Sequence, residues 1–230
     1  MERERGFVSG NQLKMIALLA MTCDHVGKQI FPQVVWLQIV GRLAFPIFAY
    51  MIAEGCVHTK NRKKYLASMA LLALICQVVY FVFMGSLYQS VLVTFSLAIV
   101  LIYAIDFAKT HLNFVGAWVV VTAFGAVWFV SVGLPILLER TDYAIDYGLT
   151  GILLVVGIYL AKGRAMKLVV AAVLLVALSL NSETVQWYGL FSLPLLALYS
   201  GRRGRGGFKY LFYIYYPAHL ACIYLLSLVI

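Results

Sequence analysis

Long uninterrupted runs of apolar residues dominate the chain, and short polar stretches separate them. Several runs approach the ~20 residues that an α-helix needs to cross the hydrocarbon core of a bilayer. The runs are continuous and do not alternate apolar with polar residues, which excludes a transmembrane β-barrel. Helices are then the remaining way to satisfy backbone hydrogen bonds in lipid. The pattern predicts an all-α integral membrane protein, a polytopic helical bundle.

Proline, glycine, asparagine and charged residues mark the breaks between these runs, and they divide the chain into nine predicted transmembrane helices. The predicted spans are Leu13–Phe31, Val34–Val57, Tyr65–Met84, Val91–Ala108, Phe114–Gly133, Tyr147–Ala161, Lys167–Leu180, Val185–Tyr199 and Tyr210–Ile230. All loops between them are short. Residues 1–230 are therefore predicted to form a single transmembrane helical domain.

Composition agrees with this interpretation, because 63% of the residues are hydrophobic and only 12% are charged, whereas a soluble domain is about half apolar. The net charge of +9 would suggest nucleic acid binding in a soluble protein, but the positions of the charges explain it differently. Fifteen of the eighteen basic residues lie in the amino terminus and in alternate loops: Arg3, Arg5, Lys14, Lys60, Arg62, Lys63, Lys64, Lys109, Lys162, Arg164, Lys167, Arg202, Arg203, Arg205 and Lys209. The positive-inside rule then predicts a cytoplasmic amino terminus. The expected partners include membrane lipids and no nucleic acid.

The four cysteines lie within or at the ends of apolar segments and have no metal-ligand spacing. We interpret Cys23, Cys56, Cys76 and Cys222 as small buried apolar residues. No metal site is predicted.

A few ionisable residues fall at membrane depth, where a charge costs at least ~2.5–3.5 kcal/mol at a helix centre. They are Asp24, His25, Lys28, Arg42, Glu54 and His219. The three in the first span also make a cleaved signal segment a poor interpretation of it. Such residues usually face the bundle interior, find partners and mark function.

Asp24 has two candidate partners. Lys28 lies four residues further on the same helix face, and Arg42 lies on the next span, so the sequence leaves both open. Arg42 itself is either an ion-pair partner of Asp24 or Glu54, or a group that holds an anion or a carbonyl oxygen. Pro46 frees a carbonyl one turn earlier and is predicted to kink this helix.

His25 and His219, on the first and last spans, are expected at similar depth and could meet at one site. An imidazole can take and return a proton at neutral pH, although a membrane histidine can also serve packing alone. Tyr216 precedes His219 in a tyrosine-rich segment that also fits an interfacial belt.

Two further segments are ambiguous. The basic residues at the end of the second span either set the membrane topology and contact anionic lipids, or bind a phosphorylated cofactor that arrives from the cytoplasm. Asp146 and Tyr147, with Gly148, fit either a helix start or a substrate contact.

The chain resembles the TraX family, and the likeness runs in order along nearly the whole sequence. It is carried by Leu13–Ala17, Asp24–Gly27, Gly41–Phe48, Glu54–Gly55, His58–Tyr65, Asp146–Gly148 and Tyr213–Leu220. The Gly-Arg-Leu-Ala-Phe-Pro and Tyr-Tyr-Pro-Ala-His phrases are its most specific parts.

This resemblance implies membrane acetyl transfer with acetyl-coenzyme A as the donor, in the cytoplasmic membrane of a bacterium, since the namesake of the family acetylates the amino terminus of conjugative pilin. A first-helix histidine is central in related transmembrane acyltransferases, and here that position is His25. The candidate catalytic residues are His25, Asp24, Arg42 and His219. The candidate coenzyme A-binding residues are Glu54, His58, Asn61, Arg62, Lys63, Lys64 and Tyr65, and the candidate substrate-binding residues are Asp146, Tyr147 and Tyr216.

Three points stay open at the level of sequence. The acceptor is a pilin, another peptide or an envelope molecule, and His25 is either a general base or a transient acyl carrier. The same polar residues also fit a proton-coupled transporter or flippase. They also fit a non-catalytic membrane assembly factor, in which they would serve as structural contacts.

Overall fold

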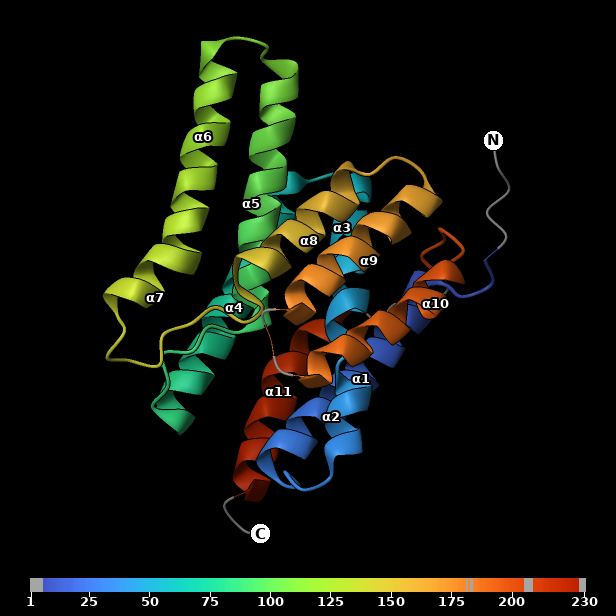
Figure 1. The fold of residues 1–230 in the computed structure, drawn as a ribbon, viewed down its shortest axis with the longest axis vertical. Helices are drawn as coiled ribbons and strands as arrows, with labels where there is room; N and C mark the ends of the chain where they lie inside the picture. Colours follow the sequence, from blue (N-terminus) through green and yellow to red (C-terminus); the bar gives the residue numbers. More distant parts are fainter. Residues whose placement is uncertain (1–5, 181, 183, 205–208, 228–230) are drawn as a thin grey trace. The chain divides into compact units, whose positions relative to one another are not determined.

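The computed structural model describes residues 6–180, 182, 184–204 and 209–227, and these residues are mainly helical. The helices are α1 (Gly10–Gln29), α2 (Val35–Gly41), α3 (Ala44–His58), α4 (Arg62–Met84), α5 (Val91–Thr110), α6 (Phe114–Trp128), η1 (Phe129–Gly133), α7 (Leu134–Leu137), α8 (Gly148–Leu160), α9 (Arg164–Leu180), η2 (Thr184–Phe191), α10 (Ser192–Ala197) and α11 (Lys209–Ser227) (Figure 1). Extended pairing in this part of the chain is limited to two isolated bridges, Val8 with Tyr199 and Gln89 with Ile145. The predicted cytoplasmic residues Arg3, Arg5 and Arg205 lie outside the described residues.

The chain forms two compact units. Unit 1 comprises Met1–Ile52 and Ala161–Ile230, and unit 2 comprises Ala53–Leu160. The boundary falls inside α3, so this helix contributes residues to both units. The single domain predicted from the sequence stays a prediction.

In unit 1, α1 packs against α2 and α11, and η2 packs against α2, α9 and α10. Two glycines let α1 and α2 approach closely. A Cβ at Gly27 would lie 2.9 Å from the Cβ of Leu37, and a Cβ at Gly41 would lie 2.7 Å from the Cα of Asp24. Small residues at helix contacts allow such backbone approach in membrane proteins. The glycines therefore bring the polar part of α1 directly against α2.

In unit 2, α5 is the central helix and contacts α4, α6 and α8. α5 and α6 form an antiparallel helical hairpin (Figure 1). Asparagine caps explain two of the helix starts. The side chain of Asn61 accepts from the amide of Lys64 at 2.9 Å, and that of Asn113 accepts from the amide of Gly116 at 3.0 Å.

Among the described residues, four helical stretches are long and apolar enough to cross a membrane: Val35–His58, Arg62–Met84, Val91–Thr110 and Phe114–Leu137. Large apolar side chains project outward from α4 and α6, among them Leu74 (61% exposed), Val82 (67%) and Val121 (61%). Exposed apolar helix faces of this size are costly in water and suit contact with lipid. These features indicate a membrane protein. The orientation of the amino terminus and the count of nine spans stay predictions, and α8 has only 13 residues.

The second predicted span is divided, as Pro46 predicts. A turn at Arg42–Leu43 separates α2 from α3, because Pro46 has no N–H to donate to the carbonyl of Arg42. The break leaves the Arg42 side chain at the junction of two short helices.

The eighth predicted span, Val185–Tyr199, is not one α-helix, which corrects the prediction for this segment. Thr184–Phe191 forms the 3₁₀ helix η2, and a six-residue α-helix follows it. Pro194 cannot donate the α-helical bond to the carbonyl of Leu190, so a regular α-helix through this segment would lose a bond there. A 3₁₀ helix rises about 2.0 Å per residue, more than an α-helix.

Candidate functional site

The carboxylate of Asp24 lies at the centre of an ion-pair cluster in unit 1. Its Oδ1 accepts from Nη2 of Arg42 at 2.8 Å, and its Oδ2 lies 2.8 Å from Nζ of Lys28. Both partners left open by the sequence are therefore present. The side chains of Asp24 and Arg42 are 11% and 12% exposed, whereas that of Lys28 is 45% exposed. The Asp24–Arg42 pair is the buried part of the cluster.

Gln186 is a further partner of Arg42, and sequence reasoning missed it. It lies in η2 and is only 4% exposed, and its Oε1 accepts from Nη1 of Arg42 at 3.2 Å. This contact fixes the amide orientation, because only the oxygen of the glutamine side chain can accept. The feature of the sequence that could have identified Gln186 is its place as a single polar residue in an apolar segment.

His25 and His219 meet in unit 1, although 194 positions separate them in the sequence. Nδ1 of His25 lies 2.8 Å from Nε2 of His219, and the two ring planes are inclined by only 3°. His219 is 7% exposed, and His25 is half-buried. Among the described residues, Nε2 of His25 has no hydrogen-bond partner. This nitrogen is therefore the one left without a partner in the histidine pair.

Aromatic and polar contacts hold His219 in place. Its ring stacks on Tyr215 at 5.2 Å between centroids, and Tyr216 meets it edge-on at 5.3 Å. The hydroxyl of Thr22 donates to the carbonyl of Leu18 at 2.9 Å, so the hydroxyl of Tyr215 donates to Thr22 at 2.5 Å. The candidate substrate residue Tyr216 is buried, at 6% exposure, and it lies beside the histidine pair.

The basic segment of unit 2 contains the candidate coenzyme A residues. Glu54 and His58 lie 3.5 Å apart on successive turns of α3. The hydroxyl of Tyr65 lies against Gly55 so closely that a Cβ there would overlap it. The approach of Tyr65 to Gly55 ties the end of α3 to the start of α4.

The other candidates in this segment differ in exposure and in partners. Asn61 uses its side-chain oxygen to cap α4, which gives it a structural role. Lys63 and Lys64 are exposed on the first turn of α4. Both ammonium groups are thus accessible to an anion in solution.

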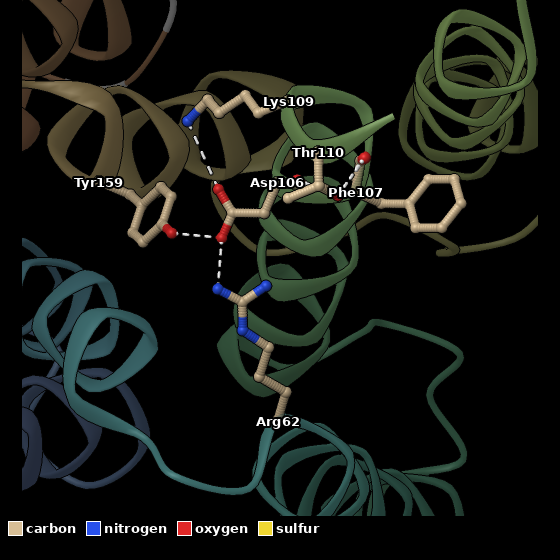
Figure 2. Close-up of polar contacts among 6 residues, drawn as sticks. All are labelled: Arg62, Asp106, Phe107, Lys109, Thr110 and Tyr159. Atoms are coloured by element: carbon tan, nitrogen blue, oxygen red, sulfur yellow. Dashed lines mark hydrogen bonds and ion pairs between the residues drawn. The ribbon is translucent and has the colours of Figure 1, made fainter. Parts of the chain in front are cut away.

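Asp106 anchors Arg62, and sequence reasoning missed this carboxylate. Its Oδ2 accepts from Nη2 of Arg62 at 2.7 Å and from the hydroxyl of Tyr159 at 2.5 Å, and its Oδ1 lies 3.4 Å from Nζ of Lys109 (Figure 2). The guanidinium of Arg62 also lies over the ring of Tyr103, 5.2 Å from its centroid. The signal available in the sequence was an acid in the last turns of an apolar helix, three residues before a lysine.

We expect Asp106→Ala to destabilise the protein by about 1–3 kcal/mol, because Arg62 and Tyr159 both lose their shared acceptor. The measurement is the free energy of unfolding by SDS titration in mixed micelles. Lys109→Met is the matched control, since this lysine is 57% exposed and its contact with Asp106 is the longest of the three, at 3.4 Å, and exposed pairs contribute little. Equal stability of Asp106→Ala and the wild type would contradict the anchoring role.

Asp146 and Tyr147 lie in a loop contact of unit 2. Oδ1 of Asp146 accepts from the hydroxyl of Tyr88 at 2.9 Å, and its carbonyl accepts from Thr94 at 2.5 Å. Burial raises the pKa of Tyr88, and the carboxylate of Asp146 raises it further. Tyr147 has a φ of 61°, which is uncommon for a residue other than glycine. Asp146 thus joins its own loop to the Tyr88 loop and to the first turns of α5.

The predicted site residues thus divide between the two units. Unit 1 holds the four candidate catalytic residues and Tyr216, and it brings His25 to His219 and Asp24 to Arg42. Unit 2 holds the candidate coenzyme A residues, with Asp146 and Tyr147. Unit 1 thus contains an imidazole with one unpartnered nitrogen among the described residues, a buried guanidinium and a carboxylate, which are groups suited to proton transfer and to stabilising negative charge.

Comparison with known proteins gives a family match over almost the whole chain. The family model described as TraX protein matches residues 9–227. Probable fimbrial assembly protein FimC, serogroup H1, of Dichelobacter nodosus is 27% identical over 253 aligned residues, which cover 94% of this chain and 94% of that protein. The uncharacterized protein RP591 of Rickettsia prowazekii (strain Madrid E) is 42% identical over 38 residues, or 16% of this chain and 15% of that protein. No solved structure matches the chain.

Proposed function

This chain belongs to the TraX family, and from that premise we propose that it is a membrane-embedded acyltransferase, which moves an acetyl group from cytoplasmic acetyl-coenzyme A to an acceptor amine or hydroxyl. The observation that carries the proposal is the histidine pair. His25 has a partner on Nδ1, and its Nε2 has none among the described residues. A base held by a third group is a recurring arrangement in acyl transfer.

In the proposed reaction, His25 is the general base. The acceptor nitrogen or oxygen attacks the thioester carbonyl carbon, and its proton passes to His25. The carbon–sulfur bond breaks, and His25 returns the proton to the departing thiolate, so acetyl-coenzyme A and the acceptor become acetylated acceptor and free coenzyme A. Arg42 stabilises the negative charge on the carbonyl oxygen, and Asp24 orients Arg42 through their 2.8 Å contact.

The basic segment near α4 is the proposed site for the phosphates of the donor. Lys63 and Lys64 are exposed there, and Arg62 presents a guanidinium that Asp106 and Tyr103 hold in one orientation. Guanidinium and ammonium groups are the usual phosphate ligands in proteins. Glu54, His58, Asn61 and Tyr65 support this segment.

The proposed location is the cytoplasmic membrane of a bacterium, in which the chain spans the bilayer about nine times with its amino terminus inside. The bias of basic residues supports this orientation. The proposed acceptor is a pilin or another peptide, and the name of the FimC relative as a fimbrial assembly protein supports this acceptor class. Asp146, Tyr147 and Tyr216 are the candidate acceptor contacts.

The test is binding and turnover of radiolabelled acetyl-coenzyme A by the purified protein in detergent. We expect saturable binding and slow release of free coenzyme A, which a peptide that carries a free amino terminus accelerates. Label that stays on the wild-type protein when the acceptor is omitted, but not on His25→Ala, would identify His25 as an acyl carrier, and turnover without such label would support a base. No binding by a folded protein would reject acetyl transfer and favour a non-catalytic role in fimbrial assembly, the role that the name of the FimC relative suggests.

A further inference from the structure

We propose that His219 is a positioning residue, which holds His25 in the tautomer protonated on Nδ1 and so makes Nε2 of His25 the reacting atom. This inference rests on the proposed function, since it identifies the atom at which the base of that reaction acts. It follows from the hydrogen bonds of the two rings and from the packing that fixes them.

The backbone of α11 determines which nitrogen of His219 carries a proton. Its Nδ1 lies 3.0 Å from the backbone carbonyl oxygen of Tyr215. A carbonyl oxygen can only accept a hydrogen bond, so Nδ1 of His219 must carry a proton. In the neutral imidazole, Nε2 of His219 then has a lone pair and can only accept.

His219 in turn determines which nitrogen of His25 carries a proton. Its Nδ1 lies 2.8 Å from that same Nε2 of His219. Since His219 accepts there, Nδ1 of His25 must donate, and it therefore carries the proton of the neutral ring. Nε2 of His25 is left with its lone pair, and this atom has no partner among the described residues. The backbone of α11 thus determines the tautomer of a histidine on α1.

Packing against two tyrosines fixes the orientation of the His219 ring. Tyr215 lies nearly parallel to the ring of His219, at 10°, and Tyr216 meets it at 83°. The hydroxyl of Tyr215 also donates to Thr22, which lies on α1 three residues before His25. Rotation of the His219 ring would break the bond to the carbonyl and both aromatic contacts. The same residues also keep α11 beside α1.

The chemical consequence is a base whose charged form has a partner. When Nε2 of His25 takes the proton of the acceptor, the resulting imidazolium still donates from Nδ1 to Nε2 of His219, and the proton on Nε2 then passes to the departing sulfur. A second group that orients the base and supports its cation is the role of the carboxylate in hydrolase triads. Here a neutral imidazole, fixed by a backbone carbonyl, has that role.

The experiment is nitrogen NMR of the full-length protein in detergent, labelled with ¹⁵N-histidine. The chain has four histidines, so single histidine-to-glutamine variants assign the signals. We expect wild-type His25 to be protonated on Nδ1 and unprotonated on Nε2, whereas a solvated histidine favours the opposite tautomer. A proton on Nε2 of His25 in the neutral wild-type protein would overturn the proposal, and this outcome needs no variant to fold.

Two variants at His219 separate positioning from packing. His219→Phe keeps an aromatic ring but no acceptor, and we expect loss of the Nδ1-protonated tautomer of His25. We also expect a fall in kcat of roughly 10²–10⁴-fold with little change in KM. His219→Gln provides a side-chain oxygen that can accept from His25, and we expect it to retain the tautomer and part of the rate. An unchanged His25 signal in folded His219→Phe would overturn the proposal. The tautomer is observed without any donor, so failure of acetyl transfer leaves this test intact.

Discussion

Replacing His25 with alanine is expected to lower the rate of acetyl transfer by about 10²–10⁴-fold, the contribution that a positioned general base usually makes. Nε2 of His25 has no partner among the described residues and is the proposed base, and alanine leaves no group there to take the proton of the acceptor. The dissociation constant of acetyl-coenzyme A should change little, because the proposed phosphate contacts lie on α4. The measurement is release of free coenzyme A at saturating donor and acceptor, with donor binding measured separately.

The matched control is His111→Ala. This histidine is exposed at the end of α5, and its side chain contacts the neighbouring residues Thr110 and Phe107. We expect its turnover to equal that of the wild type. Wild-type turnover by a folded His25→Ala protein would eliminate the base mechanism and the acyl-carrier alternative together.

The second large effect is expected from Asp24→Ala, which should destabilise the protein by about 3–5 kcal/mol, since it removes one partner of a buried ion pair and leaves the other charge in place. Asp24 is 7% exposed, and it bonds Arg42 at 2.8 Å beside the close contact of Gly41 with α1. The free energy of unfolding from SDS titration measures the loss. Loss of transfer activity should accompany it, because Asp24 also orients Arg42.

Lys28→Met is the control for this variant. Lys28 makes an equally short contact with Asp24, but its side chain is 45% exposed, and solvent screening reduces such pairs to about 1 kcal/mol or less. If Lys28→Met destabilised the protein as much as Asp24→Ala, the stabilising pair would be Asp24–Lys28, and the proposed role of Asp24 in orienting Arg42 would lose its support.

Several features followed from local sequence alone. Continuous apolar runs predicted helices, because helix formation in an apolar medium depends on backbone bonds within the segment. The break at Arg42–Leu43 followed from Pro46, and the Asp24–Lys28 pair followed from a spacing of four. Each of these depends on residues within about one helical turn of each other.

The tertiary structure decided what no spacing encodes. The contact of His25 with His219 depends on the rotation and depth of two helices far apart in sequence, and so does the choice of Asp106 as the anchor of Arg62. The 3₁₀ geometry of η2, which places Gln186 beside Arg42, corrected a predicted α-helix. Hydropathy reports how apolar a segment is, but the partner of each polar group depends on which helix faces pack together. The sequence therefore determined the helical membrane class and the candidate residues, and the packing of the helices determined which of them form a site.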